Sequence, residues 1–130
     1  MTTAVVRKAA IEVYRGVYFG VAGLDQKRQV LEMLFDGLAA SLAGMKGAYM
    51  MGDSALQKSH QARATRIIVG LEKALDTSVD QALVDNLKIV YRHLLARLAR
   101  SHGPSAPTVA DDLLGIVQPL REALSGAAAS

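Results

Sequence analysis

Residues 31–38 read Leu31-Glu32-Met33-Leu34-Phe35-Asp36-Gly37-Leu38, and apolar side chains recur in them at intervals of three and four. The same spacing continues through Leu42, Met45 and Tyr49. Because these intervals place side chains on one face of an α-helix, the sequence predicts a helix over residues 26–50. Asp25 is the expected N-cap of this helix.

A row of small residues runs along the same helix, made up of Gly37, Ala40, Gly44 and Gly47. Each glycine lowers helix propensity by about 1 kcal/mol relative to alanine. Some contact must offset this loss, so we expect either a neighbouring backbone or a segment of a partner to approach the row closely.

Three further helices are predicted from the same periodicity, over residues 54–75, 79–101 and 108–124. The pairs Ser54 with Gln57 and Ser78 with Gln81 match the capping box that begins a helix. Pro119 falls inside the last helix, where it removes a backbone donor, and we expect a kink or a split near it.

Composition and length favour one helical domain. The chain has 130 residues, of which 51% are hydrophobic but only 5% aromatic, and it has no tryptophan. A core of Leu, Ile, Val, Ala and Met favours helix on helix over a sheet. Since short connections make successive helices antiparallel, the predicted fold is an all-α, antiparallel up-and-down four-helix bundle with a proline-kinked C-terminal helix.

Three regions are expected: a flexible or capping leader over residues 1–24, the bundle over residues 25–124, and a disordered tail over residues 125–130. The leader is rich in aromatic side chains, such as Tyr14 and Tyr18, but is interrupted by glycines. It either caps one end of the bundle or occupies a groove reversibly.

No catalytic, cofactor-binding or metal-binding residues are predicted. The chain has no cysteine, and its three histidines, His60, His93 and His102, lack the spacing of metal ligands. No Glu-x-x-His pair, P-loop or nucleophile elbow occurs. We therefore expect a protein that is not an enzyme and needs no cofactor.

Charge and hydropathy also narrow the choice of partner. The net charge of +3 is a mild surplus, without the concentrated basic stripe typical of nucleic-acid binding, so no nucleic-acid partner is expected. Charged residues interrupt the first apolar stretch, and no uncharged run is long enough to span a membrane. The sequence thus predicts a cytoplasmic protein without membrane insertion.

Two polar residues, Asn86 and Tyr91, lie close to the apolar face of the third helix. If buried, they need hydrogen-bond partners, which either the bundle or another chain supplies. The apolar arc around them is wide, and it continues onto the second helix. An arc of this width favours a groove for an amphipathic or extended segment of a partner.

Several of these stretches resemble the flagellar secretion chaperones of the FliS type, over roughly residues 24–124. The resemblance rests on residues 31–37, on Ala64, Ile67, Ile68, Leu71, Leu75 and Asp76, and on Asn86, Leu87, Val90, Tyr91, Arg97 and Leu98. It implies a small helical bundle that binds the disordered C-terminal segment of flagellin and prevents its polymerisation before export. It also implies an N-terminal tyrosine, Tyr14 or Tyr18, that covers the bundle and gives way to the client.

On this hypothesis the client groove consists of Ile67, Ile68, Leu71, Leu75, Leu83, Asn86, Leu87, Val90, Tyr91 and Leu94. The expected partners are the flagellin C-terminal segment and, in addition, the flagellar export-gate protein. The alternative is a non-catalytic helical adaptor or homodimerisation module that buries the same surface against a second copy. The expected oligomeric state is a monomer or a weak homodimer.

Overall fold

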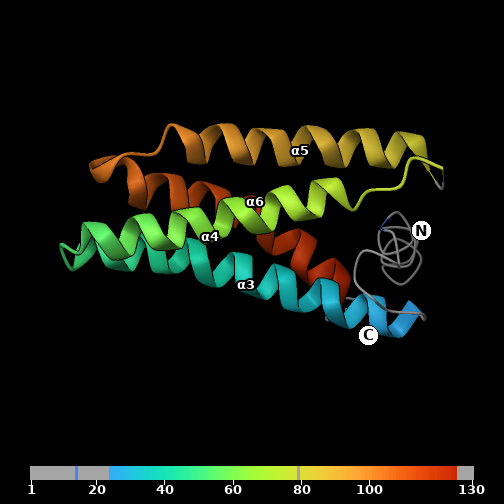
Figure 1. The fold of residues 1–130 in the computed structure, drawn as a ribbon, viewed down its shortest axis with the longest axis horizontal. Helices are drawn as coiled ribbons and strands as arrows, with labels where there is room; N and C mark the ends of the chain where they lie inside the picture. Colours follow the sequence, from blue (N-terminus) through green and yellow to red (C-terminus); the bar gives the residue numbers. More distant parts are fainter. Residues whose placement is uncertain (1–13, 15–23, 79, 126–130) are drawn as a thin grey trace.

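The computed structural model describes Tyr14 and residues 24–78 and 80–125. In chain order these residues form the helices α3 (Leu24–Met50), α4 (Ser54–Lys73) and α5 (Gln81–Ala99), the short 3-10 helix η1 (Gly103–Ser105), and α6 (Ala106–Ser125). Successive helices run in opposite directions (Figure 1). The all-helical, antiparallel four-helix bundle predicted from the sequence is confirmed. Apart from Tyr14, Leu24 and Ser125, the predicted leader and tail lie outside the described residues.

Helix α3 is the centre of the bundle and packs extensively against both α4 and α6. Its buried face is the one predicted from periodicity, with Leu31, Phe35, Leu38, Leu42 and Met45 all enclosed. Helix α5 packs mainly on α4, and its backbone approaches α6 much less closely. The edge between α5 and α6 is therefore the more open side of the bundle.

The turn from α3 to α4 combines a helix stop with a helix start. Gly52 has φ of 75°, and its N–H donates to Tyr49 O while Asp53 N–H donates to Ala48 O, both at 2.9 Å. These two bonds satisfy the last carbonyls of α3 in a Schellman motif, which needs a left-handed residue at this position. Asp53 then caps α4, since its Oδ1 accepts from Leu56 N–H at 3.0 Å.

Both capping predictions were wrong by a residue or two. Asp53, rather than Ser54, is the N-cap of α4, and Asp80, rather than Ser78, is the N-cap of α5, with its Oδ1 3.0 Å from Leu83 N. A carboxylate accepts the first amide protons at least as well as a hydroxyl and also favours the positive end of the helix dipole. Asp25 falls inside the first turn of α3 instead of capping it.

Helix α6 continues through Pro119 as a single helix, so of the two expected outcomes the split into two short helices was wrong, while the kink stays a prediction. Proline cannot donate to the carbonyl of Gly115, four residues earlier. Both residues are exposed, so water can hydrate that carbonyl, which makes the missing bond tolerable.

The row of small residues on α3 admits side chains of α4. A Cβ at Gly44 would lie 2.6 Å from the His60 ring, and a Cβ at Gly37 would lie 3.3 Å from the Arg63 guanidinium. A Cβ at Gly47 would meet nothing within 4 Å. The close approach expected at this row is thus made by side chains of the neighbouring helix at two of its glycines.

Candidate functional site

Tyr14, which precedes α3, is buried against the bundle. Its side chain is only 2% exposed, and its hydroxyl forms a hydrogen bond with the hydroxyl of Tyr91 on α5. Its backbone forms an isolated antiparallel bridge with Leu75, and its carbonyl accepts a hydrogen bond from the Lys27 ammonium. A side chain from outside the helices therefore completes the core at the end of α4 and the middle of α5.

Burial dominates the electrostatics of this tyrosine pair. It raises the pKa of Tyr14 well above the ordinary value for a phenol, although the hydrogen bond with Tyr91 partly offsets the effect. Burial likewise raises the pKa of Tyr91, and the neighbouring Tyr14 raises it further. Both phenols are therefore neutral over the physiological range, which is the state that a buried hydroxyl pair requires.

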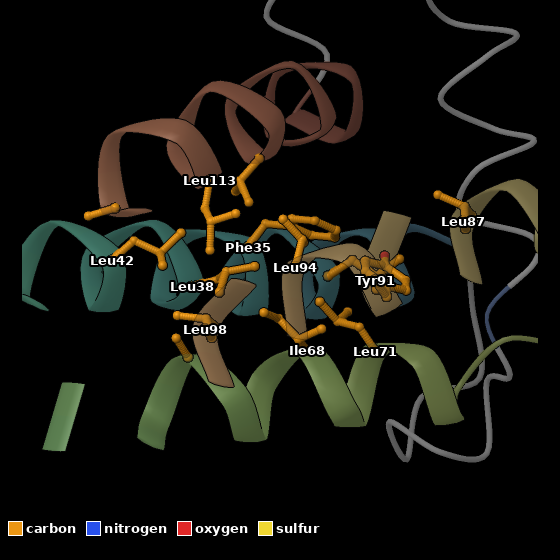
Figure 2. Packing of buried hydrophobic residues seen from close by; sticks show 14 of the residues in the cluster. Phe35, Leu38, Leu42, Ile68, Leu71, Leu87, Tyr91, Leu94, Leu98 and Leu113 are labelled. Atoms are coloured by element: carbon orange, nitrogen blue, oxygen red, sulfur yellow. The ribbon is translucent and has the colours of Figure 1, made fainter. Parts of the chain in front are cut away.

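Six of the ten predicted groove residues belong to the core. They are Ile68 and Leu71 of α4, Leu75 just after it, and Leu87, Tyr91 and Leu94 of α5. Figure 2 shows Ile68 and Leu71 rising from α4 toward Leu94, Tyr91 and Phe35. In this arrangement these side chains support the surface from beneath.

A second group lies along the edge between α5 and α6. Arg97 of α5 forms an ion pair with Asp112 of α6, with 2.6 Å between nitrogen and oxygen, so this side of α5 faces α6. Val90 and Leu83 lie two and four turns before Arg97 on the same side of α5. Ile116 and Leu120 follow Asp112 at one and two turns on α6.

We call this row the α5–α6 seam; it consists of Leu83, Leu87, Val90, Ile116 and Leu120. Leu87 is 9% exposed, and the other four are half-buried side chains packed against the core. Figure 2 shows Leu87 at the end of the cluster, beyond Tyr91. Most of the seam is therefore only partly covered.

Ile67 belongs to a different surface. With Leu34 of α3 and with Arg66, Gly70 and Leu71 of α4 it lines a shallow groove of about 170 Å³, which we call the α3–α4 groove. The structure therefore does not bring Ile67 together with the seam. The predicted residues divide between two faces and the core.

Asn86 is exposed on α5, whereas Tyr91 is buried and hydrogen-bonded to Tyr14. These two polar residues, which the sequence places close to the apolar face of the helix, therefore do not form one buried hydrogen-bond network. The partner of Tyr91 comes from the N-terminal segment, and the amide of Asn86 is available to solvent.

Sequence reasoning missed the contribution of α6. Ile116 and Leu120 lie in the helix predicted over residues 108–124, but neither was assigned to a site. Their register against α5 is set by long-range pairing, which periodicity within one helix does not reveal. The ion pair between Arg97 and Asp112 is the signal that fixes this register, and it is visible only in the folded chain.

Among the described residues, no group of three or more His, Asp or Glu side chains is placed to hold a metal ion. None of the described helices is both long and apolar enough to cross a membrane.

The bundle thus holds apolar side chains half exposed along one edge and closes its core with a tyrosine from outside the helices. A family model described as flagellar protein FliS matches residues 21–130. The chain belongs to this family, and membership implies a flagellar export chaperone. The family is not known to include enzymes. Searches of curated proteins and of solved structures found no match.

Proposed function

We propose that this protein binds the disordered C-terminal segment of flagellin in the cytoplasm and prevents its polymerisation before type III export. Family membership supports a flagellar partner in general. The choice of flagellin follows from the resemblance of the groove residues to those of secretion chaperones.

The observation that carries this proposal is the α5–α6 seam. Four of its five apolar side chains are half-buried, so an amphipathic client helix can cover them without unfolding the bundle. Each square ångström of apolar surface removed from water contributes about 25 cal/mol, and the ordering of the client opposes that gain. A covered client face is also unavailable for contacts within a filament.

Tyr14 acts as a replaceable cover in this proposal. Its main chain forms a bridge with Leu75 and accepts a hydrogen bond from Lys27, and its ring fills a core position. Its departure would expose Tyr91 and Leu75 to the client, while Ile68, Leu71 and Leu94 form the floor. Tyr18, the other tyrosine considered for this role, lies outside the described residues.

Calorimetric titration with the C-terminal segment of the organism's own flagellin tests the proposal. We expect saturable binding with a large negative heat-capacity change, because apolar surface is buried as the client folds. Val90→Ser should weaken binding about tenfold, since it removes a branched side chain from the seam. Ile89→Ser is the matched control: this neighbour on α5 is 67% exposed and lies outside the seam, so its affinity should match the wild type.

Equal loss of affinity in the two variants would remove the seam from the interface, and no binding by the wild type would refute the proposed function. Light scattering over a range of concentrations tests the alternative. A dimer that masks the seam would favour the homodimerisation module instead.

A further inference from the structure

A further concavity of the described surface adjoins the α3–α4 groove and shares Arg66 with it. It has a volume of about 530 Å³ and is lined by Lys58, Gln61, Ala62, Thr65, Arg66 and Ser101. Five of these residues belong to α4, and Ser101 follows the end of α5. The Gln61 amide donates to Leu98 O at 2.6 Å, so it fastens α4 to the last turn of α5 beside the groove.

The charges that line this groove are all positive. Lys58 and Arg66 are exposed, and neither forms an ion pair in the described part of the chain, where five other cations do. None of the lining residues is acidic. The groove therefore presents two cations whose charges no protein carboxylate compensates.

Ser101 lines the groove, and the burial of its side chain is unusual for a polar residue. The residue is 5% exposed, and its hydroxyl is buried without a hydrogen-bond partner among the described residues. A buried polar group without a partner is destabilising, commonly by about 1–3 kcal/mol, and such groups are rare in native structures. A hydroxyl in this position can donate to an anionic oxygen that enters the groove once a lining side chain shifts.

We propose that this groove binds carboxylate side chains of the client segment, an inference that rests on the proposed function. Lys58 and Arg66 would pair with acidic residues of the client, and the Ser101 hydroxyl would donate to one of the bound carboxylates. The protein would then recognise the client by charge on this surface and by apolar packing on the seam.

One peptide can reach both cations of the groove. Lys58 and Arg66 are eight residues apart, which is about 12 Å along the axis of α4. An extended peptide covers that axial distance in about four residues, so acidic side chains at the two ends of such a stretch can pair with both cations. Arg66 also lines the α3–α4 groove, so an apolar side chain next to an acidic one has an adjoining place to pack.

The test is a titration of four proteins with the flagellin C-terminal segment at low and high salt. They are the wild type, Lys58→Gln/Arg66→Gln, the control Lys73→Gln/Lys88→Gln, which removes equal charge from outside the groove, and Ser101→Ala. This unaltered segment is called the acidic segment. A second segment, in which Asp and Glu are replaced by Asn and Gln, is called the neutral segment.

We expect Lys58→Gln/Arg66→Gln to bind the acidic segment about five- to tenfold more weakly than the control variant, with a smaller salt dependence. The two double variants should bind the neutral segment with equal affinity. Ser101→Ala should weaken binding while leaving the thermal midpoint unchanged or higher, because it removes an unpaired buried group. A merely structural serine would not separate affinity from stability in this way.

If both double variants bind the acidic segment equally, the inference is wrong and the proposed function stands. If the wild type binds neither segment, both are wrong. Tighter binding of a single-stranded oligonucleotide than of the acidic segment would assign the groove to nucleic acid and also overturn the inference.

Discussion

At Gly44 the packing of α3 against α4 depends on the absence of a single methyl group. A Cβ there would lie 2.6 Å from the His60 ring, whereas a Cβ at Gly47, one turn later, would meet nothing within 4 Å. We expect Gly47→Ala to raise the free energy of unfolding by about 0.5–1 kcal/mol through helix propensity alone. Gly44→Ala should gain nothing or lose stability, because the His60 ring must move.

Urea denaturation of the two variants measures this difference. A His60→Ala background removes the obstructing ring and should restore the gain at Gly44. Equal stabilisation by both single substitutions would contradict the packing described here.

The buried tyrosine pair makes stability depend on pH in the alkaline range. The folded-state pKa of both Tyr14 and Tyr91 is raised, so the unfolded chain releases these protons first. The stabilisation is fully present below about pH 10 and decreases as pH rises toward the folded-state values, by up to about 1.4 kcal/mol per pH unit for each tyrosine.

Denaturation at pH 9 and pH 11 checks this prediction. Tyr14→Phe should reduce the loss between the two pH values, because one of the late-titrating phenols is gone. The same loss in the wild type and in Tyr14→Phe would show that other groups control alkaline unfolding.

Pro119 lies in α6 at a position where another residue can replace it without disturbing the core. Pro119 is exposed and leaves the Gly115 carbonyl without a helical donor. We therefore expect Pro119→Ala to raise the free energy of unfolding by about 1–3 kcal/mol, as measured in urea. A decrease would mean that packing of α6 on α3 requires a bend that the proline enforces.

Helix α5 should be the least protected of the four helices. It packs closely on α4 alone, whereas α3 packs on two neighbours. In native-state hydrogen exchange, the amides of α5 should open at a lower free energy than those of α3, since local stability follows contact density. Uniform protection across both helices would contradict a lower local stability of α5.

For the helices, the sequence predicted well those features that depend on residues close together in the chain. The four helices follow from apolar spacing. The N-caps were misplaced because serine and aspartate compete at neighbouring positions, and propensity alone does not rank them. The pairing of Tyr14 with Tyr91 and the register of α6 against α5 depend on contacts far apart in sequence, so no local pattern reveals them.

For the molecule as a whole, the proposed function makes Tyr14 and the client compete for the same surface of the bundle. Tyr14→Ala removes a buried aromatic side chain and should lower the free energy of unfolding by about 2–4 kcal/mol. If the covered form excludes the client, the same variant should bind flagellin more tightly, because the competent state is populated more often. Calorimetry and thermal denaturation of one preparation measure both effects, and weaker binding by a folded Tyr14→Ala would show that the tyrosine supports the interface instead.

The hydroxyl contact between Tyr14 and Tyr91 also has an optical consequence. The chain has no tryptophan and only four tyrosines, so its ultraviolet emission comes from tyrosine alone. Hydrogen bonding and burial alter phenol emission, and two of the four fluorophores are joined in this contact. A tryptophan-free client that displaces Tyr14 would therefore change the intrinsic fluorescence of the unlabelled protein. Intrinsic tyrosine emission thus reports whether Tyr14 is in place against Tyr91.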